Sequence, residues 1–305
     1  MLIINGNFKD IKPGGIFALG NFDGVHLGHK QIIKETKNIA IEKSSYPGAI
    51  VFEPHPRKFF SKNTDNFYLS NIKTKKHILE EIGLESCVIL DFDQKMASRS
   101  PEEFVREIIV EKIKPSSLII GYDFKFGINR SGNAQDLLEL CDKYEISVKI
   151  IDKQIKDGSV LSSSIVREFL QDNNFKAAES MLGHKWMIKG AVQEGDKRGR
   201  EMGFPTANLN VDNLIKLSFG VYAVKINYEG KTFNAVANYG IRPTFDGDHV
   251  LLEVHLFDFS DDLYGKDIIV SFVEFIREEK KFDGLESLKD QIDKDSKIAQ
   301  EILNK

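Results

Sequence analysis

The first half of the chain alternates short apolar runs with stretches of helical periodicity. Apolar runs at residues 15–22, 48–54, 87–93, 117–124 and 147–152 predict buried strands. Between and after them, residues 28–43, 73–83, 100–114, 133–145 and 162–170 carry the periodicity of helices. Alternation of this kind predicts an α/β domain, in which a parallel sheet is covered by helices on both faces.

The helix expected at residues 100–114 has the clearest starting signal. Ser100 is a good N-cap residue, Pro101 follows at the first helical position, and Glu103 completes a capping box. We therefore expect this helix to begin at Pro101.

The pattern changes after about Leu182. Strand-like runs at residues 185–192, 219–240, 249–259 and 266–276 are separated by turn signals such as "NYEGK" and "FDGDH". They predict a compact antiparallel barrel or sandwich. A terminal helix is expected at 285–303, with an apolar stripe formed by Leu285, Leu288, Ile292, Ala299 and Ile302. A length of 305 residues fits two domains, and we place the boundary near Gly183, giving 1–182 and 183–305.

Composition and charge narrow the class of protein. A hydrophobic fraction of 41% and a charged fraction of 29% are ordinary for a globular chain, and the net charge of −4 argues against a dedicated nucleic-acid binder. The two cysteines, Cys87 and Cys141, lack a Cys-x-x-Cys spacing, so we expect core thiols in a reducing cytoplasm. No signal peptide and no membrane-spanning run are visible, so the expected location is cytoplasmic with no membrane partner.

The stretch "FALGNFDGVHLGH" (17–29) is the first candidate site. It follows a predicted strand and leads into a helix, which is where parallel sheets bind ligands. Its glycines allow close approach of backbone N–H groups to a phosphate, and His26 and His29 share a face at the helix start. A histidine metal pair, or a structural turn with two surface histidines, is the alternative. A glycine loop or a histidine pair alone would be a weak signal of a ligand site. The complete combination is much more specific, and it consists of Gly20, Phe22, Asp23, Gly24, His26, Gly28 and His29.

Two further segments of the first half carry candidate ligand residues. In "SSSIVREFL", the hydroxyls of Ser162, Ser163 and Ser164 can receive phosphate oxygens, and Arg167 suits a bidentate phosphate contact. Ile165 and Phe169 are expected to face inward. A plain capped helix with a surface arginine is the alternative. In "GYDFKFG" (121–127), the candidate residues are Asp123, Phe124 and Phe126, whose rings would otherwise be ordinary core aromatics.

The stretch "GAVQEGDKRGREMGFPTANL" (190–209) is the second candidate site. Glycines alternate with basic residues, as a flap over a triphosphate requires; the candidates are Gly195, Gly199, Arg200 and Gly203. Thr206 and Asn208 offer hard oxygen ligands for Mg²⁺ and lie on one side of an extended segment. The spacing excludes the Gly-Lys-Ser/Thr phosphate-binding loop.

Glu253 is a candidate general base for a kinase. In "VLLEVHLF", a period of two places Val250, Leu252, Val254 and Leu256 on one face and Glu253 with His255 on the other. Glu253 can therefore face a cleft without entering the core. A solvated strand glutamate is the alternative from the pattern alone.

These motifs resemble those of known transferases. The 17–29 stretch resembles the nucleotidyltransferase signature that binds ATP phosphates. The stretches "FEPHP" (52–56), "GYDFKFG" and "SSSIVR" resemble elements of the bacterial flavin adenylyltransferases, with Ser164 and Val166 as mild departures. The stretch 190–209, "FGVYAV", "NYGIRPTF" and "LLEVHLFDF…DLYGK" resemble riboflavin kinase, in which the residue matching Glu253 is the catalytic base and those matching Asn238 and Arg277 lie near the substrates.

Over nearly its whole length, the chain resembles the bacterial bifunctional riboflavin kinase and FAD synthetase family. It implies a nucleotidyltransferase-like N-terminal domain and a riboflavin-kinase-like β-barrel. The implied reactions convert riboflavin to FMN and FMN to FAD, each with ATP and Mg²⁺, and release pyrophosphate in the second. His26, His29, Ser164 and Arg167 would position ATP and neutralise charge. Two alternatives are a single-activity enzyme with one decayed site, and a flavin- or nucleotide-binding regulator.

Overall fold

The computed structural model describes residues 1–5, 8–61, 66–156, 158–194, 204–244 and 247–305. Its contacts divide the chain into two compact units. The first unit is Met1–Thr64 with Lys75–Ser162, and the second is Asp65–Thr74 with Ser163–Lys305. By packing, residues 163–182 therefore belong with the second unit, although they precede the domain boundary expected near Gly183.

The first unit contains a six-stranded sheet; five of its strands lie where the apolar runs predict them, and the sixth, at residues 2–5, was not predicted. Its strand order is β1-β4-β3-β2-β5-β8, and every pair is parallel. The strands are β1 (Leu2–Asn5), β2 (Ile16–Leu19), β3 (Pro47–Glu53), β4 (Ser86–Asp91), β5 (Ser117–Gly121) and β8 (Ser147–Ile151). The order reverses at β2, which has β3 on one side and β5 on the other. The carboxyl end of β2 is thus a topological switch point, where such sheets bind ligands.

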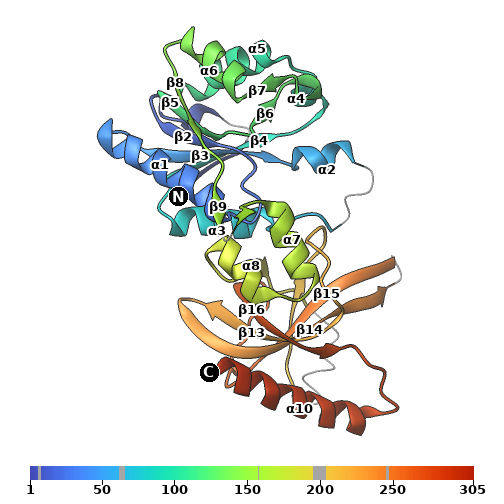
Figure 1. The fold of residues 1–305 in the computed structure, drawn as a ribbon. Coiled ribbons are helices and arrows are strands. Elements are labelled where there is room, and N and C mark those ends of the chain that lie inside the picture. The colour runs from blue at the N-terminus through green and yellow to red at the C-terminus, as the bar shows by residue number, and fades with distance from the viewer. Residues whose placement is uncertain (6–7, 62–65, 157, 195–203, 245–246) are drawn as a thin grey trace. The chain divides into compact units, whose positions relative to one another are not determined.

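Helices connect these strands (Figure 1). The helices are α1 (Leu27–Glu42), α2 (Pro56–Phe60), α3 (Ile72–Glu81), α4 (Gln94–Ala97), α5 (Pro101–Glu103) and α6 (Ala134–Asp142), with short 3-10 turns η1 (Phe8–Asp10) and η3 (Ile128–Arg130). Two small hairpins pair β6 (Lys125–Phe126) with β7 (Gly132–Asn133), and β9 (Ile155–Lys156) with β10 (Ser159–Val160). Every helix expected in this half is present.

The helix expected at 100–114 starts as its capping signal predicts. Ser100 is the N-cap, and its side chain and that of Glu103 form both bonds of the capping box. After α5 the chain continues as a π-helix, η2 (Phe104–Ile113), and ends at Lys114 in the left-handed conformation. The sequence signals the start of this helix but carries no comparable signal for its change of pitch.

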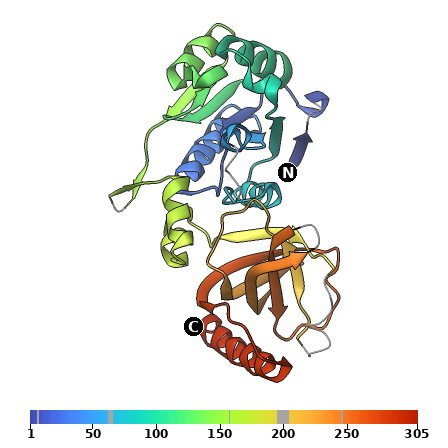
Figure 2. The ribbon, with the colours of Figure 1, turned by 90° about the vertical axis from the view of Figure 1, so that its right-hand side faces the viewer.

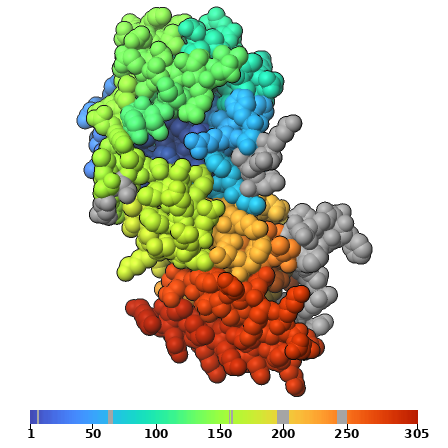
Figure 3. Space-filling view, turned by 45° about the vertical axis from the view of Figure 1, so that its right-hand side comes forward, coloured from blue at the N-terminus to red at the C-terminus, as the bar shows by residue number. Residues whose placement is uncertain are grey.

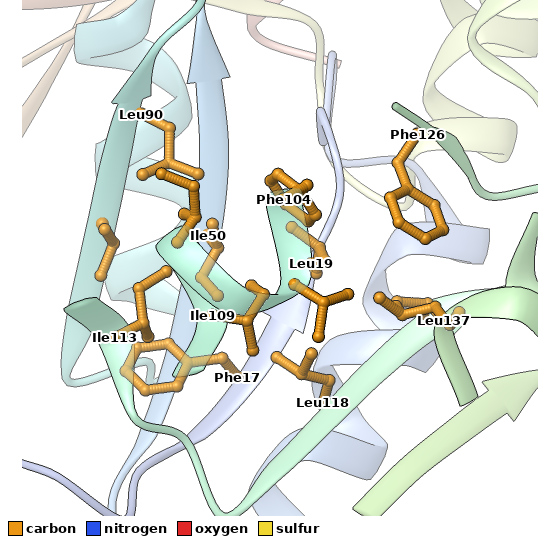
Figure 4. Packing of buried hydrophobic residues seen from close by; sticks show 14 of the residues in the cluster. Phe17, Leu19, Ile50, Leu90, Phe104, Ile109, Ile113, Leu118, Phe126 and Leu137 are labelled. Carbon is orange, nitrogen blue, oxygen red and sulfur yellow. The ribbon is translucent and has the colours of Figure 1, made fainter. Parts of the chain in front are cut away.

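A large hydrophobic core of the first unit lies on one face of the sheet. Figure 4 shows Phe17, Leu19, Ile50, Leu90 and Leu118 from the strands packed against side chains of η2 and α6. The four residues of β2 are at most 1% exposed, so this strand is held from both faces. Burial on both faces fixes the position of the loop that follows β2.

The second unit contains a six-stranded antiparallel sheet of order β11-β16-β13-β14-β15-β12. Its strands are β11 (Met187–Ala191), β12 (Ala207–Asn210), β13 (Gly220–Tyr228), β14 (Lys231–Thr244), β15 (Gly247–Leu256) and β16 (Asp267–Glu278). The backbone N–H of Gln193, just after β11, donates to the carbonyl of Asn208 in β12 at 2.8 Å. This bond brings the two edge strands together, so the sheet closes into the barrel that the sequence predicts.

Two helices, α7 (Ser163–Gln171) and α8 (Phe175–Leu182), pack with this barrel. Phe175 of α8 stacks on Phe272 of β16, with ring centroids 5.7 Å apart, and Trp186 lies against the same ring at 4.8 Å. In Figure 3 the yellow-green surface of these helices continues into the orange surface of the barrel strands. An aromatic cluster therefore joins the helices to the barrel.

Residues 66–74 also belong to the second unit, although they come from the first half of the sequence. The indole N–H of Trp186 donates to the carbonyl of Leu69 at 2.8 Å, and the N–H of Lys189 donates to the hydroxyl of Thr74 at 2.8 Å. Lys73 pairs with Asp267 at 2.7 Å. Nothing in the local pattern of this segment predicts these distant partners.

The terminal helix α10 (Leu285–Leu303) lies against β13, β14 and β16, as Figure 2 shows. Its buried positions are Asp295, Ala299 and Leu303, whereas Leu285 is 68% exposed. The apolar stripe expected from Leu285 is therefore wrong at its first residue. Asp295 is buried because Arg277 of β16 donates to both its carboxylate oxygens, through Nε at 2.9 Å and Nη2 at 2.6 Å.

We predict that Asp295→Ala lowers the free energy of unfolding by about 3 kcal/mol, because it leaves the partly buried Arg277 guanidinium without its carboxylate. Asp293→Ala, on the exposed side of the same helix, is the matched control and should change little. Urea denaturation of the full chain measures both. Equal effects of the two substitutions would contradict an anchoring role for the ion pair.

Candidate active sites

The loop after β2 has an unusual backbone. Phe22, Gly24 and Val25 have φ angles of 48°, 77° and 44°. A positive φ is strained for a β-branched residue such as Val25. Phe22 and Val25 are at most 1% exposed, so packing holds the loop in this conformation. Such strain occurs at ligand sites more often than elsewhere and agrees with the expectation from the glycines.

His26 and His29 come together at the start of α1, as their spacing predicts. His26 is the N-cap, and its Nδ1 accepts a bond from the N–H of His29 at 3.4 Å. The two rings stack with centroids 3.6 Å apart, and Phe22 contacts His29 edge-on at 5.3 Å. Since Nδ1 of His26 is an acceptor, the neutral ring carries its proton on Nε2, where it can donate to a ligand.

The pKa of His29 lies well below its usual value. Burial of the ring is the largest cause, and the nearby positive groups of His26, Lys75 and His55 lower the pKa further. Its Nδ1 is buried and has no hydrogen-bond partner in the structure. A neutral imidazole with an unsatisfied nitrogen, next to other basic groups, suits an anionic ligand that would supply both a partner and negative charge.

The other two motifs at this sheet edge lie on the neighbouring strands. "FEPHP" follows β3, and its His55 is the N-cap of α2, accepting from the N–H of Arg57 at 3.1 Å. "GYDFKFG" follows β5. Parallel strands end at one edge, so the loops after β3, β2 and β5 are neighbours. The strand order thus brings together segments that the sequence gives only as separate motifs.

The aromatic residues of "GYDFKFG" divide between core and surface. Phe126 is 6% exposed and belongs to the core, whereas Phe124 is half-buried and stacks on it with centroids 5.7 Å apart. Asp123 is exposed. The interpretation of core aromatics therefore holds for Phe126, and Phe124 with Asp123 has a surface available to a ligand.

The serines of "SSSIVREFL" fall on both sides of the division between units. Ser162 ends the first unit, and the neighbouring Leu161 lies against Gly28 of the histidine loop. Ser163 and Ser164 begin α7 in the second unit. Val166 and Leu170 are the buried positions of α7, whereas Ile165 and Phe169, which we expected to face inward, are half-buried.

Arg167 of α7 has a structural partner that the sequence does not predict. Its Nε donates to the carbonyl of Phe67 at 3.0 Å, and the guanidinium lies over the Phe67 ring, 4.2 Å from the centroid. Arg167 thereby holds residues 66–74 within the second unit.

The second candidate site is a row of side chains across the barrel. Asn208 of β12 pairs with Glu253 of β15, which pairs with Asn238 of β14. Asn238 pairs in turn with Val221 of β13, and Val221 with Arg277 of β16. Residues directly opposite one another in a sheet share a face. Register therefore aligns four residues that the sequence analysis selected from four separate segments.

This row lines a cavity of about 830 Å³. Leu252 and Val254 are buried on the other face of β15, whereas Glu253 is half-buried and reaches the cavity. The predicted alternation therefore holds around Glu253, but Leu256, expected on the opposite face, also lines the cavity. Leu288 and Ile292 of α10 add apolar surface, and the volume suits a ligand of cofactor size.

Asn208 and Thr206 have the properties expected of metal ligands. Both line the cavity, and the Oδ1 of Asn208 is buried with no hydrogen-bond partner in the structure. An unsatisfied carbonyl oxygen beside a hydroxyl is a hard-oxygen donor set, which fits Mg²⁺ better than zinc or copper. Among the described residues, no group of three or more His, Cys, Asp or Glu is placed to hold a metal ion. The flap candidates Gly195, Gly199, Arg200 and Gly203 lie outside the described residues.

Comparisons with known proteins give a family for each half of the chain. The FAD synthetase family model matches residues 9–165, and the riboflavin kinase family model matches residues 182–303. A protein of Haemophilus influenzae named bifunctional riboflavin kinase/FMN adenylyltransferase is 36% identical over 307 residues, covering both chains completely. The chain belongs to this family.

Other relatives of the same name extend the agreement. The protein of Bacillus subtilis is 34% identical over 95% of this chain and 93% of its own, and that of Escherichia coli K12 is 35% identical with the same coverage. A crystal structure described as a macrolide-efflux protein from Streptococcus pneumoniae has a TM-score of 0.80, 29% identity and coverage of 98% and 99%. In the described part of this chain, no helix is long and apolar enough to cross a bilayer.

Membership decides between the alternatives left open by the sequence. The chain carries both the adenylyltransferase and the kinase domain of the family, and it matches bifunctional relatives along its whole length. It is therefore a bifunctional transferase, neither a single-activity enzyme nor a regulator.

The lowered pKa of His29 predicts that stability falls in mild acid. Below the unfolded pKa of about 6.5, the unfolded chain binds a proton that folded His29 does not, so the stability present above pH 6.5 is lost as pH falls. Urea denaturation should show a smaller acid loss in His29→Asn than in the unsubstituted chain. The same loss in both would contradict the shift.

Proposed function

We propose that the cavity of the second unit is the riboflavin kinase site and that the histidine loop of the first unit is the adenylyltransferase site. The chain phosphorylates riboflavin to FMN and adenylylates FMN to FAD, consuming ATP in each reaction and releasing pyrophosphate in the second. The row of Asn208, Glu253 and Asn238 along one cavity wall is the observation that carries the first assignment.

In the kinase reaction, Glu253 is the general base. Its carboxylate accepts the proton of the terminal ribityl hydroxyl as that oxygen forms a bond to the γ-phosphorus of ATP and ADP leaves. Asn208 and Thr206 would hold Mg²⁺, which neutralises charge on the ATP phosphates when bound. Asn238, opposite Glu253 on the neighbouring strand, and Arg277, which lines the same cavity, orient the flavin, while Leu288 and Ile292 offer apolar contact to its ring. The flap residues Gly195, Gly199, Arg200 and Gly203 are assigned to the ATP phosphates from their motif.

In the adenylyl transfer, the protein supplies no nucleophile. A phosphate oxygen of FMN forms a bond to the α-phosphorus of ATP, and the bond from that phosphorus to pyrophosphate breaks. His26 and His29 donate hydrogen bonds to the phosphates, and the loop of Gly20, Phe22, Asp23, Gly24 and Gly28 brings backbone close to them. Asp123 and Phe124 are proposed flavin contacts.

The remaining assignments stay predictions from sequence. They are the phosphate-binding roles of Ser162, Ser163, Ser164 and Arg167, the functional boundary near Gly183 and the cytoplasmic location, whereas Phe126, a core residue, is no longer proposed as a flavin contact. The proposed partners are small molecules: riboflavin, FMN and ATP with Mg²⁺.

Separate sites predict opposite effects of two substitutions. His29→Ala should lower FAD formation from FMN about 100-fold, because it removes a phosphate donor, while FMN formation from riboflavin persists. Asn208→Ala should lower FMN formation and leave FAD formation from supplied FMN unchanged. His77→Ala and Asn210→Ala are the controls. Chromatography of products from each flavin measures both rates, and loss of both activities in either variant would argue against separate sites.

Glu253→Gln should lower the turnover number of the kinase by about 100-fold or more and leave the Kd of riboflavin nearly unchanged, because the amide keeps the shape but cannot accept the proton. Glu274→Gln, on an exposed position of β16, is the matched control. Steady-state kinetics and fluorescence titration separate the two quantities. Weakened riboflavin binding with normal turnover would make Glu253 a substrate contact instead of a base.

A further inference from the structure

Lys75 is a buried cation that the mechanism above does not use. It lies in the first turns of α3, is 1% exposed, and makes no hydrogen bond or ion pair with any residue in the described parts of the chain. Burying an ammonium without a partner is strongly unfavourable, so a lysine that serves only the fold is expected to pair or to reach solvent. The ligand-free fold therefore leaves this charge unsatisfied.

The position of Lys75 connects it to the histidine loop. Its charge acts on His29, together with those of His26 and His55, and it also acts on the buried Cys87 of β4. His29 itself holds a buried nitrogen without a hydrogen-bond partner. Two unsatisfied nitrogens thus lie within electrostatic reach of each other, and one of them belongs to the histidine loop.

We propose that Lys75 is a phosphate-binding residue of the adenylyltransferase site, where its ammonium donates to the nucleotide phosphates alongside His26 and His29. This inference rests on the proposed function of the histidine pair. A triphosphate is the ligand chemistry that explains the cluster best, because it brings several negative oxygens to a group of basic side chains that otherwise repel one another.

The role is electrostatic and involves no proton transfer by Lys75. When the FMN oxygen bonds to the α-phosphorus, the electron pair of the broken bond leaves with pyrophosphate, and negative charge grows on the leaving oxygens. A buried ammonium neutralises that charge more effectively than an exposed one, since little water screens it. Burial keeps His29 neutral, so its ring can donate a hydrogen bond only through the one nitrogen that carries hydrogen. Lys75 adds a full positive charge.

Lys75→Met tests the proposal, since methionine keeps an unbranched apolar stem and removes the charge. Lys76→Met, one position further along α3 and half-exposed, is the matched control. Lys75→Arg restores a charge at the same position. Three quantities are measured on the full chain: the rate of FAD formation from FMN and ATP, the rate of FMN formation from riboflavin, and the unfolding temperature with and without pyrophosphate.

The expected result has three parts. FAD formation in Lys75→Met falls about 10- to 100-fold in kcat/KM for ATP, which is the range for a lost charge-assisted bond. FMN formation stays within about twofold of the Lys76→Met control. The ligand-free unfolding temperature is no lower than that of the control, while the rise caused by pyrophosphate shrinks. Lys75→Arg retains more FAD formation than Lys75→Met.

Two results would overturn the proposal. One is FAD formation in Lys75→Met within twofold of the control. The other is a lower ligand-free unfolding temperature, or failure to fold, in Lys75→Met alone, because either would show that the ammonium serves the fold. His29→Ala, assayed in parallel, tests the underlying assignment separately: if it keeps its rate of FAD formation, the histidine site fails and the proposal for Lys75 fails with it.

Discussion

Both candidate sites depend on strand register, which fixes where side chains from distant segments meet. In the parallel sheet, the pairing of β2 with β3 and β5 aligns the ends of three strands, so three loops share one edge. In the barrel, antiparallel register aligns Asn208, Glu253 and Asn238 across three strands. A slip of one residue would turn Glu253 into the core and Leu252 toward the cavity. The buried apolar face of β15 prevents that slip, and so the core determines the geometry of the chemistry.

Unsatisfied buried polar atoms gather in these sites. Asn21 Oδ1, His29 Nδ1 and Asn208 Oδ1 are buried without hydrogen-bond partners, and each lies in a loop or strand to which we assign ligand binding. Such atoms destabilise the ligand-free protein, and a bound phosphate or metal ion can satisfy them. Ser86 Oγ and Ser296 Oγ share this property, and nothing in the structure explains them.

Periodicity was sufficient to predict most strands and most helix positions, because these depend on local alternation of apolar and polar residues, but it missed β1 and β12. It also put Thr206 and Asn208 on one side of their segment and Glu253 on the polar face of its strand, but only the fold shows that all three line one cavity. It could not predict burial of a charged residue. Lys75 stands in "KTKKHILEEIG", where all the lysines look alike, and Asp295 looks like any polar residue of an amphipathic helix. What distinguishes them is tertiary: the burial of Lys75 in the folded chain and the guanidinium of Arg277 beside Asp295.

The same limit applies to residues 66–74, whose partners stand more than a hundred positions away. Because this segment belongs to the second unit, the chain crosses between units three times. During synthesis, Leu69 leaves the ribosome long before Trp186, whose indole will donate to its carbonyl. Residues 66–74 therefore lack these partners while the later strands of the first unit are being made. A fragment beginning at residue 183 would lack this segment together with α7 and α8. Its barrel would expose the aromatic rings of Trp186 and Phe272. The unit that folds together therefore contains more residues than the kinase domain alone.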